Sequence, residues 1–123
     1  RHDMRICIDL DGTICELRKQ GESYADVLPK PGAADFLQRL HEQGHVIIIH
    51  TARNMQTQGH NIGKVMKSVG RIALDWLERH GIHYDEIYFG KPNASLTIDD
   101  RSIRFEGWDK ISDATINQFA RNE

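Results

Sequence analysis

The sequence predicts an α/β fold in which a parallel sheet lies between two layers of helices, as in three-layer Rossmann-like domains. Short apolar runs alternate along the chain with stretches of helical periodicity. The run at residues 45–50 encloses four consecutive β-branched residues, which is typical of a strand covered on both faces. Polar residues follow directly after the apolar runs, where parallel sheets of this kind place their ligands.

The first half of the chain supplies two strands and one helix. Apolar residues alternate up to Asp9, which ends the first strand, and Gly44 stands where a helix typically ends. No sustained period follows the first strand, so only a minimal cap is expected there. The expected elements are a strand at 4–8, a loop or small hairpin at 14–30, a helix at 31–44 and a strand at 45–50.

The second half continues the alternation. Apolar residues recur at helical spacing from Val65 to Leu77, and Gly81 ends this helix. Two short apolar runs follow, separated by a turn that contains Pro92. The expected elements are a helix at 64–80, strands at 86–89 and 95–98, and a last helix at 112–121.

Length and composition favour one domain that spans residues 1–123. Residues 1–3 precede Met4 and are either an expression remnant or the edge of a longer polypeptide. Cys7 and Cys15 show no metal-binding spacing, so we expect reduced thiols and a cytoplasmic protein. No apolar run is long enough to cross a bilayer, and the N-terminus lacks a signal-peptide pattern.

The charge balance favours a small ligand as the partner. The formal net charge is −2 and the pI is about 6.4, which argues against binding to nucleic acid. No membrane partner is expected either. The sequence leaves open whether a homo-oligomer supplies contacts in place of a lid.

Polar residues gather where the expected strands end. Because the carboxyl ends of parallel strands meet at one edge, these side chains should share one crevice. Several carboxylates without a counter-charge would destabilise the fold, and a set of oxygen ligands favours Mg²⁺ over zinc. The residues at the strand ends are Asp9, Asp11, Thr51, Lys91, Asp99 and Asp100.

Four short motifs in these positions resemble the haloacid-dehalogenase superfamily. They occur in that superfamily's order and span most of the chain. The short length, the small insertion after Thr13 and the Asp-Asp-Arg ending further resemble sugar-phosphate phosphatases of the capsule-biosynthesis type. The motifs are Asp9-Leu10-Asp11-Gly12-Thr13, His50-Thr51-Ala52-Arg53, Gly90-Lys91-Pro92 and Ile98-Asp99-Asp100-Arg101.

The resemblance implies a division of labour between the first two aspartates. Asp9 would attack phosphorus and form an aspartyl-phosphate. Asp11 would protonate the leaving oxygen and later deprotonate the attacking water, while its backbone carbonyl binds the metal. Both residues are therefore expected at the magnesium site.

The remaining motifs would bind the phosphoryl group, the metal and the rest of the substrate. Thr51 and Lys91 would hold phosphoryl oxygens, and Lys64 is the alternative to Lys91 in this role. Asp100 aligns with the superfamily's metal ligand, and Asp99 would then orient Lys91 or complete the outer shell. Which of the two binds the metal directly depends on the register and stays open, so both are expected at the metal site. The expected substrate-binding residues are Gly12, Thr13, Ala52, Arg53 and Lys64.

The implied function is a magnesium-dependent phosphomonoesterase that acts on a small, sugar-derived phosphate, in capsule or surface polysaccharide biosynthesis. A phosphatase acting on polynucleotide ends is one alternative, which the acidic charge balance disfavours. A phosphorylation-switched domain of the receiver type is another, but its phosphate acceptor lies on a later strand than Asp9. The specific substrate does not follow from the sequence.

Overall fold

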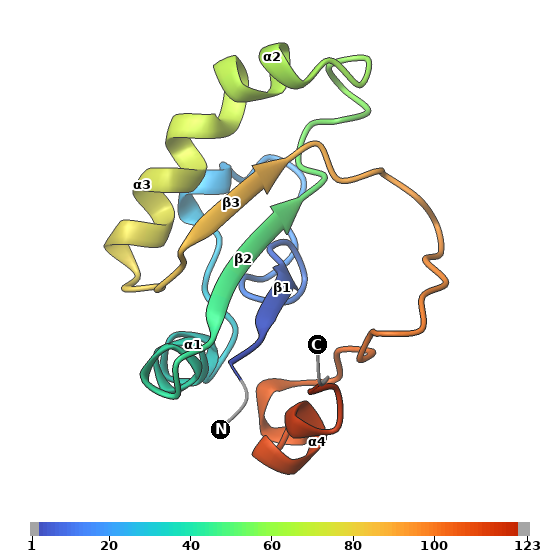
Figure 1. Cartoon of the computed structure of the whole chain (residues 1–123). Helices are drawn as coiled ribbons and strands as arrows, with labels where there is room; N and C mark the ends of the chain where they lie inside the picture. The colour runs from blue at the N-terminus through green and yellow to red at the C-terminus, as the bar shows by residue number, and fades with distance from the viewer. Residues whose placement is uncertain (1–2, 121–123) are drawn as a thin grey trace.

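A computed structural model describes residues 3–120 as a small α/β domain with a parallel sheet (Figure 1). The sheet has three strands in the order β1-β2-β3, and both pairings are parallel. This confirms the strands expected near residues 4–8, 45–50 and 86–89. The strands are β1 (Arg5–Asp9), β2 (Val46–Thr51) and β3 (Glu86–Phe89).

Helical segments connect the strands and complete the chain. The Asn61 side chain accepts a hydrogen bond from the Lys64 amide and starts the helix after β2, as an N-cap residue should. Gly44 follows the first long helix with a φ of 94°. The segments are the 3₁₀ turn η1 (Tyr24–Asp26), α1 (Ala33–Glu42), α2 (Ile62–Val65), the π-helical turn η2 (Met66–Gly70), α3 (Arg71–Arg79), the 3₁₀ turn η3 (Trp108–Lys110) and α4 (Asp113–Asn117).

The predicted helix at 64–80 is interrupted by a π turn. Five residues in η2 make this turn between α2 and α3, so the buried positions shift by one residue. Ala73 is fully buried beyond the turn, whereas Ile72 is half-buried. Simple helical spacing gives no sign of such a turn. The last helix, α4, is shorter than predicted, and the end of that prediction at residue 121 lies outside the described residues.

The main core packs against one face of the sheet. Ile8, Ile47 and Ile49 point to this face, and apolar residues of α1 and α3 cover them. Trp76 is 1% exposed, and its indole donates a hydrogen bond to the Val27 carbonyl. A smaller cluster of Met55, Val65 and Val69 lies beneath α2. The core therefore fixes the positions at which β1 and β2 end.

The second helical layer of the predicted three-layer fold is not formed by residues 3–120. The opposite face of the sheet presents Arg5, Cys7 and Tyr88, which are all exposed. The alternation within β1 places Arg5 and Cys7 away from the core, whereas Ile8 points into it. Helices thus cover one face of this small sheet.

The fourth strand predicted at 95–98 is absent from the described chain. Residues 92–104 are exposed and contain no strand, and the segment runs out to one side of the sheet before it returns to α4 (Figure 1). Residues 90–94 are too few for the crossover that a further parallel strand of the same sheet would need. No helix within residues 3–120 is long and apolar enough to span a membrane.

Candidate active site

Asp9 and Lys91 form an ion pair at the carboxyl end of the sheet. Asp9 ends β1, and its Oδ1 lies 3.3 Å from Lys91 Nζ. The Gly90 and Lys91 amides both donate to the Thr51 carbonyl, at 3.1 and 3.0 Å, and tie this turn to the end of β2. The strand ends thus bring a carboxylate and a cation together, as the sequence predicts.

Burial raises the pKa of the Asp9 carboxyl above its ordinary value. Lys91 opposes this rise through its charge and hydrogen bond, and Asp11 adds to it by charge repulsion. A further cation bound beside Asp9 would therefore stabilise its charged form. Its side chain is 35% exposed, so it is open to a ligand from solvent.

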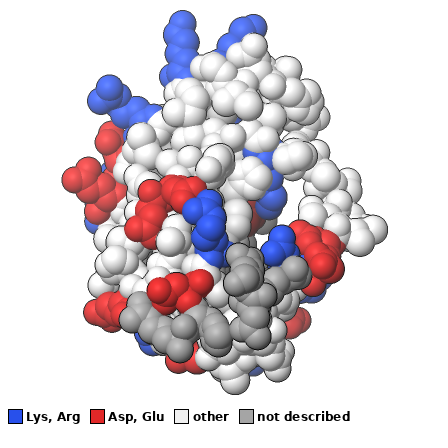
Figure 2. All heavy atoms as spheres, viewed as in Figure 1, with Lys and Arg blue, Asp and Glu red and all other residues white. Residues whose placement is uncertain are grey.

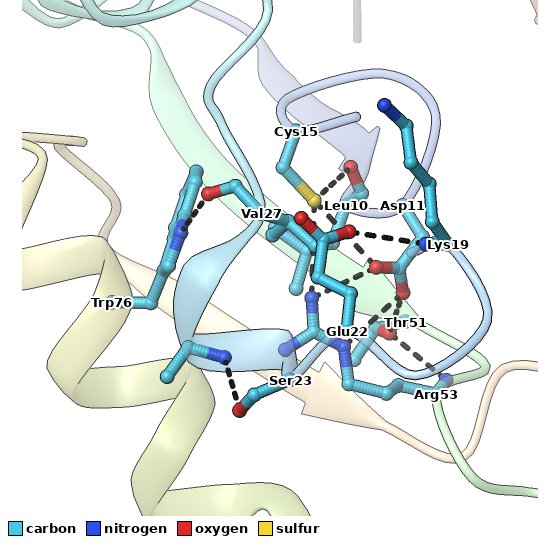
Figure 3. Close-up of polar contacts among 11 residues, drawn as sticks. Leu10, Asp11, Cys15, Lys19, Glu22, Ser23, Val27, Thr51, Arg53 and Trp76 are labelled. Atoms are coloured by element: carbon cyan, nitrogen blue, oxygen red, sulfur yellow. Dashed lines mark hydrogen bonds and ion pairs between the residues drawn. The ribbon is translucent and has the colours of Figure 1, made fainter. Parts of the chain in front are cut away.

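The Asp11 carboxylate turns inward and accepts hydrogen bonds from three side chains (Figure 3). Arg53 Nη2 lies 2.8 Å from Oδ1, and Arg53 Nε lies 3.4 Å from Oδ2. Thr51 Oγ1 donates to Oδ2 at 3.3 Å. The Cys15 thiol donates to Oδ1 at 3.6 Å. Asp11 is thereby held as an acceptor.

Arg53 is buried behind the site. Its side chain is 1% exposed, and its guanidinium lies over the Tyr24 ring, with 4.0 Å between the guanidinium carbon and the ring centroid. Its Nη1 is buried and has no hydrogen-bond partner among the described residues. The predicted contact between Arg53 and substrate is therefore not open in this arrangement.

Thr51 is fully buried at the end of β2. Its hydroxyl accepts a hydrogen bond from the Arg53 amide at 3.0 Å and donates to Asp11. The residue thus joins the backbone after β2 to the first motif. Its predicted contact with a phosphoryl oxygen would require this hydroxyl to turn away from Asp11.

Two residues of this network carry no signal in the motifs. Tyr24 comes from η1, and Cys15 from the loop after β1. Burial is the main cause that raises the pKa of the Cys15 thiol to about 12, and the negative charge of Asp11 adds to it. Cys15 is therefore a neutral hydrogen-bond donor. Both cysteines are free, in agreement with the expectation of reduced thiols.

The other predicted substrate-binding residues lie around this network. Gly12 has a φ of 86° and donates its amide to the Cys15 carbonyl, while the Thr13 carbonyl accepts a hydrogen bond from the Trp108 indole. Ala52 packs on the cluster beneath α2. Lys64 is exposed on α2, and Figure 2 shows Lys and Arg side chains projecting from this end of the molecule.

Asp99 and Asp100 are exposed and lie on the segment that leaves the sheet. The backbone amide of Arg101 donates to Asp99 Oδ1 at 3.0 Å and is the main cause that lowers the pKa of Asp99. Within residues 3–120, the one cluster of three or more potential His, Cys, Asp or Glu ligands does not include Asp9. A single chain therefore does not assemble the predicted set of carboxylates.

That cluster consists of His41, His83 and Asp85, whose ligand atoms lie within 4.8 Å of one another. The His41 and His83 rings stack with their centroids 3.7 Å apart. Asp85 accepts a hydrogen bond from the Ile47 amide at 2.8 Å, which anchors the loop before β3. Sequence spacing does not reveal this group, because α1 and the loop before β3 are far apart along the chain.

The fold and the site define a small α/β protein with a Rossmann-like parallel sheet and a polar cluster at the carboxyl ends of its strands. A solved structure of D,D-heptose 1,7-bisphosphate phosphatase from B. bronchiseptica, in complex with magnesium and phosphate, shares this fold. It is 15% identical and has a TM-score of 0.50, with 76% of this chain and 54% of that chain covered. No protein-family model and no curated protein matches the sequence.

A second solved structure is more similar. It is the crystal structure of a protein from Vibrio cholerae. The two chains are 34% identical, the similarity covers 95% of each, and the TM-score is 0.83. The chain belongs to the same family as this Vibrio cholerae protein.

Proposed function

We propose that this protein is a magnesium-dependent phosphomonoesterase of the haloacid-dehalogenase type that acts on a small, sugar-derived phosphate. The observation that carries the proposal is the Asp9–Lys91 ion pair at the end of β1, with Asp11 on the same turn. This arrangement supplies a nucleophile and a cation beside the place where phosphoryl charge develops. Action in capsule or surface polysaccharide biosynthesis and a cytoplasmic location remain predictions.

In the proposed reaction, an Asp9 oxygen attacks phosphorus. A bond forms between that oxygen and phosphorus, and the bond from phosphorus to the substrate oxygen breaks. Lys91 stabilises the negative charge on the phosphoryl oxygens. Water then attacks the aspartyl-phosphate, which releases phosphate and restores Asp9.

Asp11 would transfer the proton in both steps, but it must first change partners. In this arrangement its carboxylate oxygens are occupied by hydrogen bonds from Arg53, Thr51 and Cys15. Substrate binding would have to turn Asp11 toward the leaving oxygen. Arg53 then serves to position Asp11 between turnovers.

The donors of one chain fit magnesium in part. The partly exposed Asp9 carboxylate is a suitable oxygen ligand, and burial makes its charge unfavourable without a cation. Asp99 and Asp100 would be the further carboxylates, but their segment leaves the sheet. The ion would neutralise charge on Asp9 and the phosphoryl oxygens. The B. bronchiseptica phosphatase, which was solved with magnesium and phosphate, supports this choice of ion.

A phosphate-release assay tests the proposal. The panel contains phosphorylated sugars, glycerol-like phosphates, nucleotides, a 5′-phosphorylated oligonucleotide and an aryl phosphate. We expect the highest turnover on a phosphorylated sugar, loss of activity with chelator, and recovery with magnesium. Asp9→Asn should abolish turnover, whereas Asp75→Asn, an exposed substitution on α3, should not. Undiminished activity after thorough chelation would exclude a magnesium requirement. Preference for the oligonucleotide would exclude a small, sugar-derived phosphate as the substrate.

A further inference from the structure

The outer edge of β1 is open in the described chain. β1 pairs with β2 only, so it is an edge strand of the sheet. Ile6 is only partly buried against the core, and Cys7 on the other face is exposed. Edge strands present unpaired backbone groups to any compatible strand, and most proteins cover or blunt them. This edge is a pairing site that the described chain leaves unused.

Residues 95–99 have the pattern of a strand but are not part of the sheet. Leu96 and Ile98 alternate with polar residues and are 73% and 90% exposed. This alternation suits a strand with one covered face, and Thr97 and Ile98 are β-branched. Asp99 is the last residue of this segment, and Asp100 follows it directly. An apolar strand face and an open sheet edge are therefore both present.

The connection from β3 is too short for residues 95–99 to pair in parallel with β1 of the same chain. Five residues, 90–94, separate β3 from residue 95, whereas a parallel crossover needs a dozen or more. An antiparallel return would place Asp99 and Asp100 at the amino end of the sheet, opposite to Asp9. A segment from another copy is not limited by the length of this connection, and it can pair in the parallel direction.

We propose that residues 95–99 of one copy pair in parallel with β1 of a second copy and bring Asp99 and Asp100 to that copy's Asp9. The exchange is reciprocal, so two chains complete two sites. The strand pairing stands on the structure alone, while the role of the two aspartates at the site rests on the proposed function. The second copy thereby supplies the carboxylates that are missing beside Asp9.

One register satisfies both faces of the added strand. With Asp99 opposite Asp9, Ile98 lies next to Ile8 and Leu96 next to Ile6, on the face that packs on the core. Thr97 then lies next to Cys7 on the other face. A shift by one residue would turn both apolar side chains to the open face. The pattern of residues 95–99 therefore specifies the register as well as the direction.

Cross-linking tests the pairing without reference to activity. Thr97→Cys should form a disulfide with Cys7 of the second copy, because neighbouring strands lie about 5 Å apart, within reach of such a bond. Partial burial of the sulfur raises the pKa of the Cys7 thiol, although the residue as a whole is exposed, so oxidation is best run at alkaline pH. We expect a covalent dimer on a non-reducing gel and a dimer mass by light scattering before oxidation.

Two variants control for random collision. Thr97→Cys with Cys7→Ser should not cross-link at position 7, and Ile98→Cys, which faces the core side in this register, should cross-link far less. A wild-type protein that is monomeric by light scattering would overturn the strand exchange. A disulfide that joins Cys7 to the introduced thiol within one chain of the Thr97→Cys protein would overturn it as well.

Complementation tests the shared site. Asp9→Asn and Asp100→Asn proteins are each expected to be inactive. Refolded together at equal amounts, they should recover about a quarter of wild-type activity, because half of the random pairs are mixed and each mixed pair holds one intact site. Asp9→Asn mixed with the double variant should recover none. A covalent dimer without complementation would show that the strands pair but that Asp99 and Asp100 play no part in the site of the second copy. An inactive wild type would refute the proposed function, while the cross-link still decides the pairing.

Discussion

The charged form of Asp9 is unfavourable in the folded protein. Burial raises its pKa despite Lys91, so the folded state holds the Asp9 proton more tightly than the unfolded chain does. This residue therefore favours the folded state below its ordinary pKa of 3.8, and that contribution is lost as pH rises through the raised pKa.

We expect Asp9→Asn to stabilise the metal-free protein at neutral pH, because the amide has no charge to desolvate. The gain should shrink as pH falls below 3.8, where wild-type Asp9 is protonated in both states. Urea unfolding of the wild-type and Asp9→Asn proteins in the presence of chelator, at neutral and acidic pH, measures this difference in the free energy of unfolding. Asp75→Asn is the exposed control, and a gain that is equal at both pH values would contradict this explanation.

Arg53 couples the second strand end to the first motif. Removal of its guanidinium would leave the Asp11 carboxylate without its main partner and Tyr24 without the nearer of the two arginines that lie over its ring. We expect Arg53→Ala to lower the free energy of unfolding by about 2–4 kcal/mol, near the range for breaking a buried pair. The exposed control Lys64→Ala should change it by less than about 0.5 kcal/mol.

Kinetics separate this positioning role from substrate recognition. If Arg53 acts through Asp11, Arg53→Ala should lower kcat/KM on an aryl phosphate and on the preferred sugar phosphate by similar factors. A loss confined to the sugar phosphate would instead place the guanidinium against the substrate, as the sequence predicts.

Among the elements, the turn after β3 controls where Lys91 lies. Gly90 has a φ of 96°, and an added Cβ would come within 2.9 Å of the Ile62 side chain on α2. Gly21 has a similar φ of 80° but open space around it. Substitutions at these two glycines therefore separate the effect of backbone strain alone from the effect of moving Lys91.

We expect Gly90→Ala and Gly21→Ala to lower the free energy of unfolding by about 1–2 kcal/mol each, from left-handed strain. Only Gly90→Ala should also reduce kcat, because it shifts Lys91 relative to Asp9. Unfolding curves and phosphate-release kinetics on both variants provide the comparison. Equal kcat values for the two would mean that this turn does not control Lys91.

The elements were predictable where packing follows local pattern. The β-branched run of β2 and the apolar residues of α1 determine structure by themselves, and the sequence predicted both. The π turn at Met66–Gly70 was not predictable, because five apolar positions at helical spacing fit a regular helix equally well. The strand predicted at 95–98 is absent from the single chain. Its alternating pattern suits a strand but does not specify the strand with which it would pair.

The site was predictable as a set of residues but not as a set of contacts. Motif positions brought Asp9 and Lys91 together, as their strand ends require. The inward turn of Arg53 depends on Tyr24 and Cys15, which come from a loop without periodicity. Such contacts depend on tertiary packing, which spacing does not encode.

At the scale of the whole molecule, two parts of the chain behave differently. Residues 3–90 build the sheet and its core, and α4 with Trp108 returns to that core through Phe36 and Thr13. Residues 92–104, between these two parts, are exposed, and the segment is held at both ends. It can therefore reach a neighbour without unfolding either end.

If residues 95–99 exchange between two copies as proposed, catalysis should depend on the protein concentration. A site that needs a second copy exists only above the dissociation constant of the pair, so specific activity should fall on dilution rather than stay constant. Initial rates measured over a wide range of enzyme concentration, at saturating substrate and magnesium, show whether it does. The Thr97→Cys protein, oxidised to a covalent dimer, should hold a constant specific activity over the same range. Abundance of the chain would then itself regulate phosphate release.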